Sequence, residues 1–127
     1  MLRILLIGAG GFIGAVLRYW LSGYVQRLAR SELFPLGTLG VNVLGCLLIG
    51  FLSYLAEARS AFTPELRALV FTGILGGFTT FSTFSNETFN LLRGGEGLSA
   101  LLNLVAHVVL GIGSVWLGRT LAYAIWR

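Results

Sequence analysis

Four long apolar stretches take up almost the whole of the 127-residue sequence. They lie near residues 4–24, 36–56, 66–92 and 98–124, and each is as long as the ~20 residues that an α-helix needs to cross a bilayer. Hydrophobic residues make up 56% of the chain and charged residues 11%, whereas an ordinary soluble domain carries charge on about a quarter of its residues. These features predict an all-α membrane protein, with one four-helix transmembrane domain over residues 1–127.

The glycine-rich segment Gly8–Gly14 has a second interpretation, because glycines that follow an apolar run also open dinucleotide-binding folds. The four apolar stretches leave no sequence for the further strands and helices of such a fold, so we exclude it. Glycines and serines four residues apart instead favour close packing between membrane helices. Such pairs are Gly10 with Gly14, Gly73 with Gly77, and Ser114 with Gly118.

The ends of the predicted helices carry the expected signals. Pro35 precedes the second stretch, and Gly94-Gly95 follows the third. Thr63-Pro64-Glu65 combines a capping residue, a proline for the first helical position and an acid for the first turn. We therefore expect four helices joined by short loops.

The charged residues are thinly spread, as nine arginines and five glutamates. If the helices alternate in direction, five arginines fall on the N-terminal side and three on the other, a weak form of the bias that fixes orientation. The five are Arg3, Arg59, Arg67, Arg119 and Arg127, and the three are Arg27, Arg30 and Arg93. So weak a bias permits insertion in both orientations, so we expect an antiparallel, dual-topology homodimer in the lipid bilayer. The net charge is +4, but the charged residues stand singly in loops and form no basic patch, which argues against a nucleic-acid partner.

Polar residues in the second and fourth stretches recur at helical spacing. Thr38 and Asn42 share one face of the second stretch, and Asn103, His107 and Ser114 share one face of the fourth. Polar groups at membrane depth are costly and mark either hydrogen bonds between helices or a lined pathway. The sequence leaves both interpretations open, although for His107 alone a structural role is favoured.

The third stretch reads Gly-Gly-Phe-Thr-Thr-Phe-Ser-Thr-Phe-Ser over residues 76–85. Paired glycines followed by paired threonines are poor helix formers, so we expect the helix to break in its middle and to free backbone carbonyls that favour a cation. Just beyond, Phe81 and Phe84 are interleaved with the hydroxyl residues Ser82, Thr83 and Ser85. The positive edge of a phenyl ring beside hydroxyl donors favours a small anion, and ordinary packing of the rings is the alternative.

These residues closely resemble the small dual-topology fluoride channels of the Fluc or CrcB family. The resemblance spans all four helices. It rests on Gly-Thr-Leu-Gly-Val-Asn at 37–42, the segment at 76–85 and Gly-Ala-Val-Leu-Arg at 14–18.

The resemblance implies an antiparallel homodimer with two fluoride pathways and passive export through the plasma (inner) membrane. A structural sodium ion at the dimer centre would be held by the backbone carbonyls of Gly76 and Thr79. Phe81 and Phe84 would line the pore, Asn42 would donate its amide toward the ion, and Arg18 would attract anions in a vestibule. The polar track would comprise Thr38, Ser82, Thr83, Ser85, His107 and Ser114. Gly111 stands where a hydroxyl is expected on the fourth helix. Glu87 follows the motif at a pore end, where a carboxylate does not suit an anion path, and we expect it to organise its neighbours by hydrogen bonds.

Two other functions stay open. A small multidrug-type proton-coupled transporter is also a four-helix dimer, but it needs a membrane-buried carboxylate, and the first stretch holds no acid. A non-transporting membrane assembly subunit would need only the glycine faces. We do not expect an enzyme, since no nucleophile, base and orienting group occur together.

Overall fold

The computed structural model describes all of residues 1–127 and contains helices and loops but no β-strand. Four helical spans are long and apolar enough to cross a membrane, and each predicted stretch lies inside one of them. They are Leu2–Ala29, Leu36–Ala58, Pro64–Arg93 and Gly97–Trp126. The prediction of an all-α, multi-pass membrane protein with four spanning segments is therefore confirmed.

Three spans are single helices, and the third is divided. The single helices are α1 (Leu2–Ala29), α2 (Leu36–Ala58) and α6 (Gly97–Trp126). The third span consists of α3 (Pro64–Arg67), the π-helix η1 (Ala68–Leu75), α4 (Gly76–Phe78) and α5 (Phe81–Arg93).

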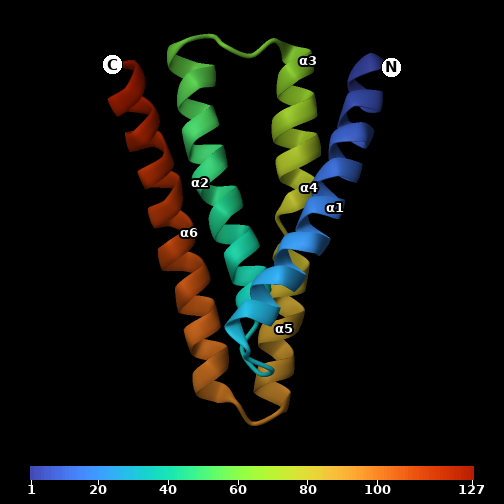
Figure 1. The fold of residues 1–127 in the computed structure, drawn as a ribbon, viewed down its shortest axis with the longest axis vertical. Helices are drawn as coiled ribbons and strands as arrows, with labels where there is room; N and C mark the ends of the chain where they lie inside the picture. Colours follow the sequence, from blue (N-terminus) through green and yellow to red (C-terminus); the bar gives the residue numbers. More distant parts are fainter.

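The spans run alternately up and down, so both termini lie at the same end of the molecule (Figure 1). We call this the terminus end, and it also carries the α2–α3 connection. The opposite end, with the α1–α2 and α5–α6 connections, is the loop end. α2 packs mainly against α6, and α1 packs mainly against η1.

The predicted break in the third span lies at Thr79 and Thr80. Both have extended backbone, with φ −90° and ψ 156° at Thr79 and φ −150° and ψ 113° at Thr80. The Thr80 hydroxyl then caps α5 by accepting a hydrogen bond from the Thr83 amide at 3.2 Å. The threonine pair thus ends one helix and begins the next.

The π-helix η1 was not predicted. Most π-helical segments are single turns within an α-helix, whereas η1 runs for eight residues. The start of the span was predicted correctly, because the Thr63 hydroxyl accepts from the Leu66 amide at 3.2 Å and Pro64 stands in the first turn.

Glycines bring the helix backbones together as their spacing predicted. A Cβ at Gly10 would lie 2.9 Å from Gly73 Cα, and one at Gly77 would lie 2.6 Å from the Gly11 carbonyl oxygen. A Cβ at Gly14 would overlap the carbonyl oxygen of Ile74. Gly118 meets the α2 backbone in the same way. Close packing between membrane helices is therefore confirmed on both sides of the molecule.

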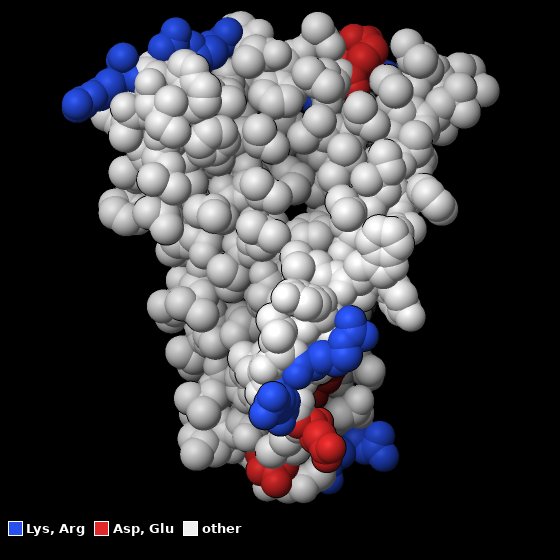
Figure 2. Space-filling model, viewed as in Figure 1, with Lys and Arg blue, Asp and Glu red and all other residues white.

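Charged side chains gather at the two ends and leave an uncharged band between them (Figure 2). At the terminus end, Arg3 pairs with Glu65 at 3.4 Å and Arg119 pairs with Glu57 at 2.8 Å. Such a band is what a protein needs where it meets lipid hydrocarbon.

Candidate functional site

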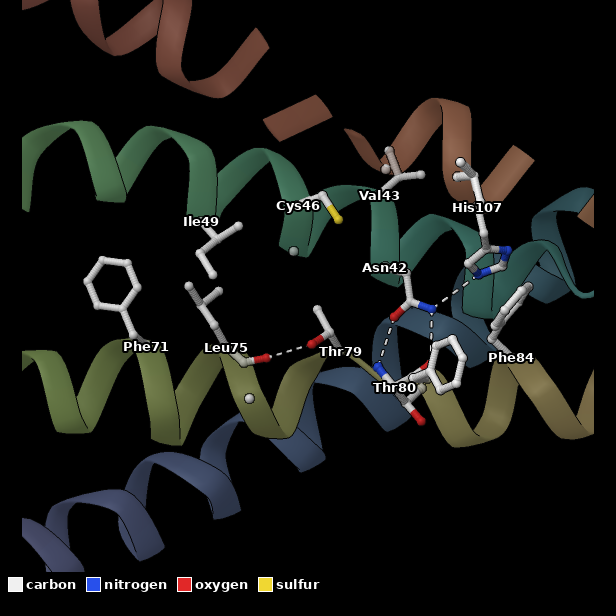
Figure 3. Close-up of a pocket in the computed structure, with 15 residues that line it drawn as sticks. Asn42, Val43, Cys46, Ile49, Phe71, Leu75, Thr79, Thr80, Phe84 and His107 are labelled. Carbon is white, nitrogen blue, oxygen red and sulfur yellow. Dashed lines mark hydrogen bonds between the residues drawn. The ribbon is translucent and has the colours of Figure 1, made fainter. Parts of the chain in front are cut away.

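A cavity of about 420 Å³ lies beside the helix break, between α2, the third span and α6. We call it the central cavity. Its walls include six of the predicted site residues and no charged side chain. These six are Asn42, Gly76, Thr79, Phe81, Phe84 and His107. The remaining wall is mostly apolar and includes Val43, Cys46, Ile49, Phe71 and Leu75 (Figure 3).

Asn42 on α2 binds the peptide group of Thr80 at the break. Its Oδ1 accepts from the Thr80 amide at 2.9 Å, and its Nδ2 donates to the Thr80 carbonyl at 3.1 Å (Figure 3). In an unbroken helix the Thr80 amide would donate to the Gly76 carbonyl four residues earlier. Asn42 therefore replaces the hydrogen bond that the break removes. We call this pair the Asn42–Thr80 clasp.

His107 on α6 lies on the other side of Asn42. Its Nε2 is 3.1 Å from Asn42 Nδ2, and its Nδ1 is 3.0 Å from the carbonyl oxygen of Asn103. The imidazole ring also stacks on Phe84, with ring centroids 4.1 Å apart. His107 thus joins the clasp to one of the two predicted pore phenylalanines.

Two polar residues extend this network toward the loop end. Asn103 is fully buried, and its Nδ2 donates to the Thr88 hydroxyl at 2.9 Å. That hydroxyl donates to the Phe84 carbonyl at 2.8 Å. The network therefore ties α6 to α5 as well as to α2.

The two predicted pore phenylalanines are in contact but differ in exposure. Their ring centroids are 5.6 Å apart with an angle of 54° between the planes. Phe81 is 78% exposed in the single chain, whereas Phe84 is half-buried against His107. One ring therefore faces outward from the subunit, and the other faces inward.

The hydroxyl residues predicted for the polar track lie outside the walls of the central cavity. Thr83 Oγ1 accepts from the Thr80 hydroxyl at 3.0 Å. The same Thr80 hydroxyl oxygen lies 3.5 Å from Ser82 Oγ. Ser85 donates to the Phe81 carbonyl at 2.9 Å. Ser114 is half-buried on α6, beyond the cavity residue Gly111.

Thr38 and Glu87 form a polar pair one helical turn from Asn42. The Thr38 hydroxyl donates to Glu87 Oε1 at 2.8 Å, and the second carboxylate oxygen is buried without a partner. Glu87 also lines a second cavity of about 950 Å³, the loop-end cavity. The pair therefore belongs to the loop-end cavity through Glu87 and not to the central cavity.

The loop-end cavity is polar and carries charges of both signs. Its charged residues are Arg27, Arg30, Glu32, Glu87 and Glu96. Gln26 shapes it by binding the α1–α2 loop, since its side chain donates to the carbonyls of Ser31 and Phe34 and accepts from the Gly37 amide. The predicted vestibule residue Arg18 is half-buried and lines neither cavity.

The two predicted carbonyl donors, Gly76 and Thr79, both line the central cavity. The Gly76 carbonyl has lost its usual amide partner to Asn42. No group of three or more His, Cys, Asp or Glu side chains could hold a metal ion. Any cation bound here would therefore meet uncharged oxygen atoms.

Sequence reasoning missed the parts played by Thr80 and Thr88. Thr80 supplies the peptide that Asn42 binds, and Thr88 links Asn103 to α5. The signal for Thr80 was present, because a hydroxyl residue directly before a new helix is a typical cap. Thr88 gave no signal, since a threonine inside a helix commonly bonds its own backbone.

Comparison with known proteins relates most of the chain to one family. A family profile described as "CrcB-like protein, Camphor Resistance (CrcB)" matches residues 5–119. The "Fluoride-specific ion channel FluC 1" of Methanosarcina acetivorans is 50% identical over 119 residues, which cover 94% of this chain and 89% of the relative.

Two further relatives carry the name "Fluoride-specific ion channel FluC". The protein from a Sulfurovum species is 49% identical over 118 residues, which cover 93% of this chain and 91% of the relative. The protein from Ruminiclostridium cellulolyticum is 43% identical over 125 residues, which cover 98% of this chain and 95% of the relative. These names describe ion channels and not enzymes, in agreement with the expectation from sequence.

Proposed function

The chain belongs to the CrcB family, and on this premise we propose that it is a channel through which fluoride crosses the membrane. The observation that carries the proposal is the central cavity, which combines the rings of Phe81 and Phe84 and the amide of Asn42 with no charged side chain. An arginine or lysine in these walls would hold a small anion too firmly for rapid release.

Fluoride binds its hydration water tightly, so a pore must replace that water with several weak donors. Phenyl edges carry partial positive charge and serve as such donors. The Asn42 amide nitrogen already donates to the Thr80 carbonyl and lies 3.1 Å from His107 Nε2. A passing ion would therefore compete with these partners for the amide, which gives a weak interaction that suits rapid release. Thr38, Ser82, Thr83 and Ser85 would offer further hydroxyls along the path.

We propose passive transport, with fluoride leaving the cell across the plasma membrane along its electrochemical gradient. A negative cell interior drives anions outward without an energy source. The mixed charges of the loop-end cavity would form one mouth of the path, and Arg18 would attract anions to a vestibule. The passive mode is tested in liposomes with equal fluoride on both sides, where reversing the membrane potential should reverse the net flux.

We propose that two subunits assemble as an antiparallel homodimer with two pathways. Phe81 is 78% exposed in the single chain, and a pore ring needs a second wall to exclude lipid. The weak arginine bias of the sequence permits both orientations. Side-specific labelling of a terminal cysteine tests the arrangement, and labelling from one side alone would contradict it.

We also propose that the carbonyls of Gly76 and Thr79 hold a structural sodium ion at the dimer centre. The freed Gly76 carbonyl supports this, because an oxygen without its usual helical partner suits a hard cation. Thermal unfolding in sodium or in N-methylglucamine at equal ionic strength tests it. We expect a lower Tm without sodium, and an unchanged Tm would contradict the proposal.

The two alternative functions have less support. A proton-coupled transporter needs a carboxylate in the membrane interior. The half-buried glutamates are Glu65, which pairs with Arg3 at the terminus end, and Glu87, which is bonded to Thr38 beside the loop-end cavity. A non-transporting assembly subunit has no need of a central cavity lined with uncharged polar groups.

Fluoride efflux from loaded liposomes, measured with an ion-selective electrode, tests the main proposal. We expect fluoride to leave far faster than chloride. Phe81→Ile and Phe84→Ile should each slow the efflux about tenfold, because an aromatic interaction is worth ~0.5–1.5 kcal/mol and about 1.4 kcal/mol is a factor of ten.

Phe89→Ile is the matched control, since Phe89 is exposed on the same helix but does not line the central cavity. Equal rates for fluoride and chloride, or normal rates in both pore variants, would contradict the proposed function.

A further inference from the structure

We propose that His107 is a positioning residue: its Nε2 accepts the second hydrogen of the Asn42 amide and thereby holds the Asn42–Thr80 clasp in place. This requires the neutral imidazole with its proton on Nδ1. The inference rests on the proposed function, because the clasped peptide lies directly before the pore ring Phe81.

The orientation of Asn42 is fixed by the Thr80 peptide. An amide N–H only donates and a carbonyl only accepts, so Asn42 Oδ1 must face the Thr80 amide and Nδ2 must face the Thr80 carbonyl. The measured distances of 2.9 and 3.1 Å agree with this arrangement. One hydrogen of Nδ2 is then left over, and His107 Nε2 lies 3.1 Å from that nitrogen. Nε2 must therefore act as an acceptor.

The other side of the imidazole leads independently to the same tautomer. His107 Nδ1 lies 3.0 Å from the Asn103 carbonyl oxygen, which can only accept. Nδ1 must therefore carry the proton. Asn103 is itself fully buried and bonded to Thr88, so the carbonyl that selects the tautomer is held in place.

A proton on Nε2 instead would place a donor against the donor of Asn42. The amide would then have to release the Thr80 carbonyl or leave a part-buried hydrogen unpaired. The stacking of His107 on Phe84 at 4.1 Å would survive, because it does not depend on which nitrogen is protonated. Hydrogen bonding and packing by the same ring can therefore be separated.

Two substitutions make this separation. In His107→Gln the longer side chain can bring an acceptor oxygen to the position of Nε2. In His107→Asn the shorter side chain can keep the bond to Asn103 but cannot reach Asn42. Both variants lose the aromatic stack, so a difference between them reports on the bond to Asn42.

The first test is nitrogen-15 NMR of the full-length protein in liposomes at neutral pH. The chain has a single histidine, so its ring signals need no assignment by mutation. We expect a protonated Nδ1 and an unprotonated Nε2. A proton on Nε2, in either the other tautomer or the charged ring, would overturn the proposal whether or not the protein carries fluoride.

The second test compares the two variants by fluoride efflux and by hydrogen exchange of the Thr80 amide. We expect efflux through the Asn variant to be about tenfold below that of the Gln variant, since an unpaired donor shielded from water costs ~1–3 kcal/mol and the Asn42 amide is part-buried. The Thr80 amide should exchange faster in the Asn variant alone. Equal exchange rates in the two variants would overturn the proposal. If the unaltered protein carries no fluoride, the proposed function fails while the NMR and exchange results still decide the role of His107.

Discussion

The two helix pairs of the subunit are held together alike but contribute differently to the central cavity. In the pair formed by α1 and the first half of the third span, Gly14 lies against the Ile74 backbone. In the pair formed by α2 and α6, Gly118 lies against the Leu47 backbone in the same way. Yet α1 supplies none of the residues that line the central cavity, whereas α2 and α6 supply Asn42 and His107. Close glycine packing therefore marks the scaffold, and polar side chains mark the site.

The divided third span belongs to both pairs. Its parts η1 and α4 pack on α1, while α5 packs on α6 and makes no comparable contact with α1. The break at Thr79 and Thr80 therefore lies where the span changes its packing partner. A break at this position lets each half of the span follow its own neighbour, and it leaves a peptide group for Asn42 to bind.

The largest effect is expected from a change in the scaffold pair. Gly14→Leu would force a side chain into the Ile74 backbone, which cannot move as a flexible side chain could. Overpacking typically costs ~1–3 kcal/mol and more against rigid surroundings, so we expect little or no folded protein by size-exclusion chromatography and thermal unfolding.

Gly8→Leu is the matched control for this variant, because nothing lies within 4 Å of a Cβ at Gly8. It should leave the yield and the Tm unchanged. A Gly14→Leu protein as stable as Gly8→Leu would show that α1 is not tightly packed on the third span.

The next effect is expected from the site, with the scaffold kept intact. Asn42→Asp removes the two donors that bind Thr80 and His107 and adds a negative charge beside an anion path. We expect fluoride efflux to fall about 100-fold, since each of the two part-buried contacts that is lost leaves an acceptor unpaired, at a cost of ~1–3 kcal/mol, while the protein still elutes as a folded species.

Asn86→Asp makes the same chemical change at an exposed position of α5 that lines neither cavity. Its efflux should stay close to that of the unaltered protein. If both variants slowed efflux equally, the loss would come from added charge in general and not from the clasp.

The smallest effect is expected from the α2–α6 pair at the terminus end. Arg119→Gln removes the ion pair with Glu57, which lies in the open at the surface. Exposed ion pairs contribute little to stability, so neither the Tm nor the efflux rate should change measurably. A marked fall in either would mean that this end of the pair is covered in the assembled protein.

The sequence predicted the structure best where the backbone preferences of neighbouring residues decide it. Gly76-Gly77 followed by Thr79-Thr80 predicted the break, and Thr63-Pro64 predicted the start of the third span, because both depend on backbone preferences of adjacent residues. The glycine spacings predicted close packing for the same reason. The π-helix η1 was not predicted, and the backbone preferences of adjacent residues do not account for it.

The contacts within the site could be predicted only in part. The spacing placed Asn42 on one helix face and His107 on another, but it did not give the register between α2 and α6 that brings them to 3.1 Å. Glu87 was expected to organise neighbours by hydrogen bonds, but its partner could not be named because Thr38 lies 49 residues away in the sequence. The expected vestibule residue Arg18 and the sodium donors Gly76 and Thr79 stay predictions.

The even number of crossings has a practical consequence for topology measurements. Residues 1 and 127 emerge at the same end of the molecule, so a reporter fused to either one samples the same compartment. In a population with mixed insertion, proteolysis from one face should remove equal fractions of amino-terminal and carboxy-terminal reporters. Unequal fractions would reveal molecules in which one span had failed to cross.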